Sequence, residues 1–157
     1  MTPFFILVIS FLILRATGWL GVKHLSSWKT AGRVALAITF LFTGVTHFTA
    51  MRHDYLAMIP DPFPQQMWAI YLTGAFEIAG AIGLLIPGTR KIAGLCLMIL
   101  LIAMFPANVN AALNEISFRG QPPTSLWLRT PIQIFFIAMI WWASVQKASG
   151  QSEKETV

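Results

Sequence analysis

Hydrophobic residues form five long segments along the chain, and a polar stretch or a proline- and glycine-containing turn separates each segment from the next. Each segment is close to the ~20 residues that a helix needs to cross the ~30 Å hydrocarbon core of a bilayer. The pattern therefore predicts an all-α membrane-embedded bundle. It is a single domain over residues 1–146, followed by a disordered tail at 147–157. The five spans are predicted at about 3–22, 33–50, 67–87, 91–110 and 127–145.

The composition supports a membrane protein and excludes an ordinary soluble domain. Hydrophobic residues make up 56% of the chain and charged residues only 11%, whereas soluble domains have about 25% charged residues. A chain of 157 residues cannot bury this much apolar surface in its own core. The net charge of +5 comes from residues at the segment ends, where Lys and Arg set membrane orientation, so we expect no nucleic-acid partner.

The distribution of Lys and Arg predicts which ends of the spans face the cytoplasm. The more basic side carries seven of these residues and the other side three; the cytoplasmic side is expected to be the richer one. The N-terminus is then outside, the C-terminus is cytoplasmic, and the loops at 51–66 and 111–126 face outward. The first segment lacks the basic start of a signal peptide, so we interpret it as a retained helix. The seven are Lys23, Lys29, Arg33, Arg90, Lys91, Lys147 and Lys154, and the three are Arg52, Arg119 and Arg129.

Glu77 is the most informative residue because it lies in the middle of an apolar span. At 1.5 Å per residue it is about 15 Å below Met67, where its span begins, and Arg15 is about 18 Å below Pro3. The matching depths predict a structural Arg15–Glu77 ion pair. The alternative is a ligand- or proton-handling role, which is the default hypothesis for an ionisable residue inside a membrane.

Small residues surround Glu77 on its helix face. Thr73, Gly74, Gly80 and Ala81 lie three or four positions from Glu77 and share its face. Small residues allow membrane helices to pack closely. We therefore expect Glu77 to face protein rather than lipid.

Four further polar residues fall at the outer ends of three other spans, where they are predicted to form a rim above Glu77. His47 ends the second span, Asn108 follows Pro106 in the fourth, and Arg129 and Gln133 lie one turn apart in the fifth. Three of the four also have a structural interpretation. His47 would pack at a helix end, Asn108 would satisfy backbone groups freed by Pro106, and Arg129 would anchor its helix at the interface.

Motifs for hydrolytic, nucleotide or thiol chemistry are missing from the sequence. There is no catalytic triad, no phosphate-binding glycine loop and no paired-carboxylate site. The one cysteine, Cys96, is expected to be a buried apolar residue. The predicted depths separate His47 and His53 from Glu77, so we expect no metal site. We also expect no catalytic residue, because the sequence offers no obvious nucleophile–base pair. Redox chemistry would have to come from a bound cofactor or a partner subunit.

The motifs "GVTHF", "MIPDPFP", "YLTGAFEIAGAIGLLIP", "RKIAG", "FPANVNAAL" and "LWLRTPIQ" follow one another over roughly residues 33–145. In this order they resemble the DoxX family of small bacterial membrane proteins. The resemblance implies a four-helix core in the bacterial inner (cytoplasmic) membrane, with the first span as an additional N-terminal helix. It also implies a link to quinone and thiol redox systems. The family's recurring polar positions map onto His47, Glu77, Asn108, Arg129 and Gln133.

These observations lead to one expected function and two alternatives. The expected role is an accessory subunit or binding module of a membrane redox or respiratory system, with an intramembrane pocket for a quinone-like or lipid ligand. We do not expect such a protein to be a stand-alone enzyme, although a subunit of an oxidoreductase complex is consistent with these features. Its expected partners are the lipid bilayer, a hydrophobic small molecule, and a larger membrane complex or redox protein. The alternatives are a purely structural small subunit and, more weakly, a small-solute transporter, for which no inverted repeat is visible.

Overall fold

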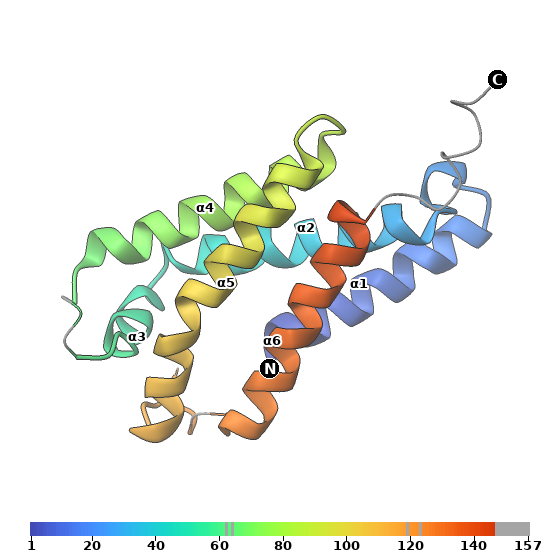
Figure 1. The fold of residues 1–157 in the computed structure, drawn as a ribbon. Helices are drawn as coiled ribbons and strands as arrows, with labels where there is room; N and C mark the ends of the chain where they lie inside the picture. Colours follow the sequence, from blue (N-terminus) through green and yellow to red (C-terminus); the bar gives the residue numbers. More distant parts are fainter. Residues whose placement is uncertain (62, 64, 119, 123, 147–157) are drawn as a thin grey trace.

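The computed structural model describes residues 1–61, 63, 65–118, 120–122 and 124–146, and these residues form a bundle of α-helices (Figure 1). The described residues contain no β-strand, only an isolated bridge between Phe118 and Gln121. The all-α prediction is therefore confirmed, whereas the predicted disordered tail lies outside the described residues. The long helices are α1 (Thr2–Trp19), α2 (Trp28–Thr46), α4 (Met67–Leu85), α5 (Arg90–Leu113) and α6 (Leu126–Ile140), which continues as the π-helical turn η2 (Trp141–Val145); the short ones are η1 (Lys23–Leu25) and α3 (Arg52–Ala57).

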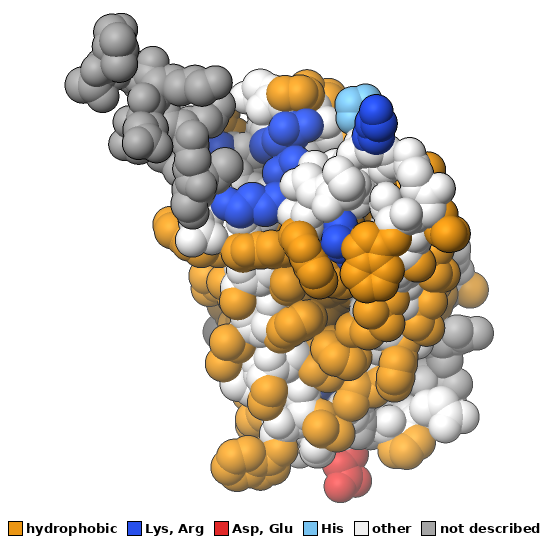
Figure 2. Space-filling model, turned by 90° about the vertical axis from the view of Figure 1, so that its right-hand side faces the viewer, with side chains coloured by type: hydrophobic (Ala, Val, Ile, Leu, Met, Phe, Trp, Pro, Cys, Tyr) orange, Lys and Arg blue, Asp and Glu red, His pale blue; other side chains and the backbone are white. Residues whose placement is uncertain are grey.

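Four of the long helices have the length and composition to cross a membrane: α1, α4, α5, and α6 together with η2. Between 11% and 33% of the most apolar 18-residue stretch of each helix is buried, so most of these apolar side chains point outward. Ile9, Leu12, Ile99 and Ile134 are between 55% and 65% exposed. Figure 2 shows one face with a broad hydrophobic surface below a group of Lys and Arg side chains. A surface of this kind indicates a protein embedded in a membrane.

Helix α2 is the central helix of the bundle. It contacts α1, α4, α6 and η2, and Figure 1 shows it between α4 and α1. Nine of its 19 residues are buried, and most of these are Ala, Gly or Thr. It is less apolar than the other long helices, since its first turns contain Lys29 and Arg33 and its buried residues are mostly small. It begins five residues before the predicted span and ends at Thr46 rather than at 50.

Helices α2 and α4 pack closely where two glycines meet. A Cβ atom added at Gly74 would lie 2.6 Å from the His47 Cβ and 2.9 Å from the Gly44 carbonyl oxygen. One added at Gly44 would lie 2.9 Å from the Gly74 carbonyl oxygen and 3.2 Å from the Glu77 Cβ. Only glycine fits such an approach without displacing a helix. The prediction that the small face around Glu77 packs against protein is therefore confirmed.

The predicted Arg15–Glu77 ion pair is wrong, because Arg15 is engaged in the connection between α1 and α2. Its Nη1 donates to the carbonyl oxygens of Leu25 at 3.2 Å and Ser26 at 2.5 Å, and its guanidinium lies 4.2 Å from the centre of the Trp28 ring. Arg15 is one turn from the end of α1. Its long side chain therefore reaches the free carbonyls of the connection more readily than a group at mid-membrane.

Candidate functional site

A cavity with a volume of about 620 Å³ lies among the helices, within the range typical of small-molecule sites. Its walls come from α2, α4, α5 and α6, and residues 1–4 and the connection between α5 and α6 add to its edge. The segment between α2 and α4, including Tyr55 of α3, also contributes, so seven separate parts of the chain line one cavity. All five predicted ligand residues line it, namely His47, Glu77, Asn108, Arg129 and Gln133.

The His47 ring is held in one orientation by α4 and α3. Its Nδ1 lies 3.1 Å from the Ile70 carbonyl oxygen, which can only accept a hydrogen bond, so Nδ1 carries a hydrogen. The Tyr55 ring stacks on the imidazole with a centroid distance of 4.2 Å and an interplanar angle of 5°. In a neutral imidazole the other nitrogen, Nε2, then has a free lone pair. This lone pair is on the side of Glu77.

Glu77 and His47 face each other across a gap. The Glu77 Oε2 is 3.8 Å from His47 Nε2, which is too long for a direct hydrogen bond. None of the described residues donates a hydrogen bond to this oxygen, although Thr43 interacts with the carboxyl group. Glu77 and His47 are only 5% and 2% exposed. Buried polar atoms without a partner are rare in proteins and require an explanation.

The gap suits a polar atom of a ligand. A carboxylate oxygen and a lone pair on Nε2 both accept hydrogen bonds, so together they fit a hydroxyl donor. When Glu77 carries a proton, it can instead donate to a carbonyl oxygen. The same two side chains can therefore bind either the hydroxyl or the carbonyl form of one oxygen atom.

The predicted layering, with Glu77 deep and His47 at the outer surface, is wrong. His47 follows the last residue of α2, but it contacts Ile70 and Thr73 and lies against Gly74. Gly74 is seven residues, or about 10 Å, inside the start of α4. The start of α4 and the helix α3 extend beyond His47, so the end of α2 is below the outer edge of the bundle. His47 and Glu77 therefore form one deep pair.

Arg129, Asn108 and Gln133 link α5 to α6 on another wall of the cavity. Arg129 Nη1 donates to Asn108 Oδ1 at 2.9 Å, and its Nε donates to the Thr124 carbonyl at 2.8 Å. Gln133 donates to the Leu101 carbonyl at 2.8 Å. Helix α5 continues through Pro106 to Leu113. These residues thus combine helix pairing with a polar cavity wall.

Thr43 and Tyr55 also line the cavity, and neither was predicted from the sequence. Thr39, Thr43 and Thr46 occur at helical spacing before His47, which is a signal that this face is polar. Tyr55 gave no such signal because it belongs to α3, inside a segment predicted only as a loop. Its hydroxyl lies 2.8 Å from Thr46 Oγ1.

Neither a metal cluster nor a buried cysteine is found in the described part of the chain. Among the described residues, no three His, Cys, Asp or Glu side chains are grouped in a way that would hold a metal ion. The expectation that Cys96 is buried is wrong, since its side chain is exposed on α5. In a membrane this position faces lipid, so a small apolar residue is still suitable there.

Comparison with known proteins assigns the chain to a family. The family described as "Domain of unknown function (DUF8561)" matches residues 36–144, and the chain belongs to this family. The matched region includes all five predicted ligand residues and excludes α1. No curated protein and no solved structure matches the chain.

Proposed function

We propose that this protein is an intramembrane binding module for a quinone-type ligand, and that it acts as an accessory subunit of a membrane redox system. The observation that carries the proposal is the deep pair formed by Glu77 Oε2 and His47 Nε2. The two atoms are 3.8 Å apart, buried, and line a cavity of about 620 Å³. An isolated charge or polar atom in this position is costly unless a partner occupies the gap.

The chemistry of the cavity suits an aromatic ring that carries oxygen atoms. A quinol hydroxyl donates to Glu77 or His47, and a quinone carbonyl accepts from a protonated Glu77. Phe40, Leu101 and Phe136 supply apolar surface for the ring. Arg129 and Gln133 add hydrogen-bond donors from α6. In this proposal the ligand supplies the redox chemistry, while the protein binds it and exchanges a proton at Glu77.

The proposed membrane arrangement has five spans, with α2 as the fifth and α1 as an addition to a DoxX-like four-helix core. Lys29 Nζ donates to the Gln146 carbonyl, and Arg33 Nη1 donates to the Ala143 carbonyl. The start of α2 and the end of η2 therefore lie at the same basic end of the bundle. We assign this end to the cytoplasm of a bacterium and the protein to its inner membrane, because basic residues favour the cytoplasmic side.

The open cavity favours binding over the structural alternative. A subunit that serves only to fill a groove in a larger complex needs well-packed helices, and its internal space is normally filled by side chains. Here the cavity remains, and the Glu77 carboxylate oxygen in it lacks a donor among the described residues. A small-solute transporter finds no specific support in the cavity geometry.

The test is to purify the protein in lipid nanodiscs from its native membrane and to quantify quinones in an organic extract. We expect quinone enrichment in the wild-type sample relative to empty nanodiscs from the same membrane. Glu77→Gln should reduce this enrichment at least tenfold. Glu115→Gln is the matched control, because Glu115 is an exposed carboxylate in the connection between α5 and α6.

The outcomes separate the candidate functions. Quinone in the wild-type and Glu115→Gln samples, with loss in Glu77→Gln, supports the proposal. Enrichment of a phospholipid in place of quinone overturns the quinone assignment and identifies a lipid site. If no apolar molecule is enriched with the wild-type protein and the protein co-purifies with a larger complex, the structural-subunit alternative is favoured instead.

A further inference from the structure

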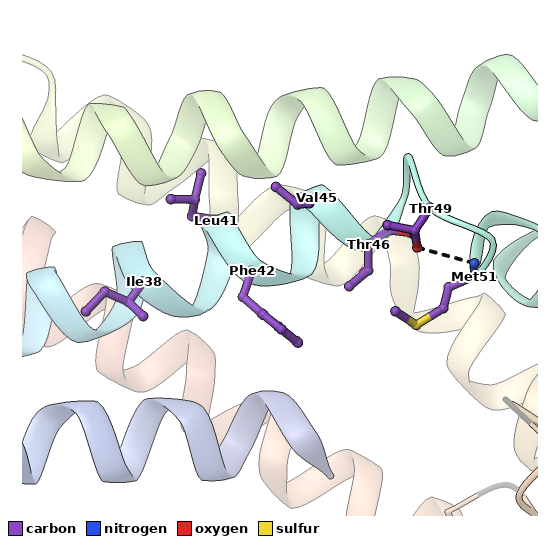
Figure 3. A pocket seen from close by; sticks show the side chains of 7 residues that line it. All are labelled: Ile38, Leu41, Phe42, Val45, Thr46, Thr49 and Met51. Atoms are coloured by element: carbon purple, nitrogen blue, oxygen red, sulfur yellow. Dashed lines mark hydrogen bonds between the residues drawn. The ribbon is translucent and has the colours of Figure 1, made fainter.

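A second hollow, here called the α2 groove, runs along the outer face of α2 (Figure 3). Its volume is about 440 Å³. The side chains of Ile38, Leu41, Phe42 and Val45 are between 43% and 49% exposed, so in a membrane the groove is open to lipid. The complete lining is Ile38, Leu41, Phe42, Val45, Thr46, Thr49 and Met51.

The α2 groove is continuous with the polar cavity. Phe42, Thr46 and Met51 line both spaces. Figure 3 shows Phe42 and Met51 extending from the same side of the α2 region, toward α1. These three side chains therefore stand between the lipid-facing groove and the cavity that contains Glu77.

We propose that Phe42, Thr46 and Met51 form a lateral portal for an amphiphilic ligand. The head group passes between them from the bilayer into the polar cavity, and its hydrocarbon tail remains in the α2 groove. This inference rests on the proposed function and specifies the ligand class. The ligand is a quinone with a hydrocarbon tail, and not a free ring or a water-soluble molecule.

The three portal residues differ in their ability to move. Thr46 is fixed, because its hydroxyl donates to the Thr43 carbonyl and its oxygen contacts the Tyr55 hydroxyl. Met51 has an unbranched side chain with three rotatable bonds, and such side chains adapt readily. Phe42 is 45% exposed and can rotate into lipid. Opening the portal therefore needs rotation of two side chains and no displacement of a helix.

The length of the groove fits a tail that lies along the helix. Ile38 and Val45 are seven residues apart, which is about 10 Å along α2. The lining offers hydrocarbon contacts over this whole length. Lipid tails are as apolar as these side chains, so binding in the groove changes the tail's position more than its affinity. A test of the inference must therefore measure where the tail lies.

The experiment uses a benzoquinone with a decyl tail that ends in a diazirine, added to wild-type protein in nanodiscs. After illumination, mass spectrometry maps the cross-linked residues. We expect at least fivefold more cross-linking to the groove residues of α2 than to Ile99 or Ile134, which are more exposed to lipid. An excess of a tailless benzoquinone should compete, because it occupies the cavity and displaces the head group.

Val45→Trp is the key variant, since Val45 lines the groove but not the cavity. It should lower cross-linking to α2 at least fivefold and leave binding of the tailless ring unchanged. Ile99→Trp is the matched control on α5 and should change neither measurement. Ile38→Trp is a second groove variant, should Val45→Trp fail to fold.

The tailless ring distinguishes failure of this inference from failure of the proposed function. Suppose that the ring binds in a Glu77-dependent way but the tail cross-links are spread evenly over the lipid-facing surface. This result overturns the portal and leaves the proposed function standing. If the tailless ring does not bind to the wild-type protein, the proposed function fails and the portal fails with it.

Discussion

At the scale of single residues, Tyr55 controls the orientation of His47. Thr46 already donates its hydrogen to the Thr43 carbonyl, so in the contact between the two hydroxyls Tyr55 is the donor. Tyr55→Phe keeps the stacked ring and loses this hydrogen bond, and we expect it to cost about 1 kcal/mol of stability. Tyr55→Ala also removes the ring and should cost about 3 kcal/mol. Unfolding in detergent, followed by near-UV circular dichroism, measures both; equal losses would contradict the role of the ring.

The same residue gives a prediction about pH. Burial, more than the nearby charges of Glu77 and Asp54, raises the pKa of Tyr55 above its ordinary value. A group whose folded-state pKa is raised contributes stability that is fully present below its unfolded pKa and is lost as pH rises through the folded value. The advantage of Tyr55 over Tyr55→Phe should therefore be constant from pH 6 to 9, begin to fall above about pH 10, and be lost as the pH rises through the higher pKa of the folded state. A difference that changed between pH 6 and 9 would contradict this assignment.

Arg129 is the residue that joins the outer parts of α5 and α6. Its hydrogen bonds to Asn108 Oδ1 and to the Thr124 carbonyl both come from a charged donor. Arg129→Gln removes both of these charged hydrogen bonds. We expect it to lower the free energy of unfolding in detergent by about 2 kcal/mol. Asn108→Asp keeps an acceptor for Arg129 and should be less harmful than Asn108→Leu. Equal effects of the two Asn108 variants would show that the contact is not important.

At the scale of helices, the crossing of α2 and α4 sets the position of the deep pair. Gly74→Ala places a methyl group 2.6 Å from the His47 Cβ and 2.9 Å from a backbone oxygen, so the helices must separate. We expect a loss of about 1–3 kcal/mol and weaker binding of a quinone ring. Gly88→Ala is the control, because an added Cβ there has no atom within 4 Å. Similar losses in both variants would indicate a general effect of replacing glycine.

The sequence predicts helices more reliably than it predicts their relative levels. The apolar runs locate the long helices within a few residues, and the small face around Glu77 correctly predicts a close helix contact. Counting residues from each segment start placed Arg15 beside Glu77 and His47 well above it. Both errors have the same origin. Helix tilt and the folding of the connections shift helices along each other, and both are tertiary properties that a residue count does not contain. Helix α3, which brings Tyr55 to His47, has no apolar pattern that would reveal it.

At the scale of the whole molecule, α2 decides the topology. It is the most enclosed of the long helices, so only one of its faces has to be apolar for contact with the bilayer. It begins with basic residues and is rich in small ones. A helix that its neighbours cover on most sides can span a membrane with such a composition, because only the face with Ile38, Leu41, Phe42 and Val45 is open to lipid. If α2 spans, the connection before it and the connection after it are on opposite sides of the membrane.

This topology can be tested with single cysteines in a Cys96→Ser background, which is needed because Cys96 is exposed. Lys23→Cys precedes α2, Asp61→Cys follows it, and Lys91→Cys is at the start of α5; all three positions are exposed. We expect a membrane-impermeant maleimide to label Asp61→Cys in intact cells, and the other two only after permeabilisation. Labelling of Lys23→Cys and Asp61→Cys from the same side would mean that α2 does not cross. The basic ends of α2 and α5 would then face opposite sides, and the deep pair would have to be placed outside the bilayer centre.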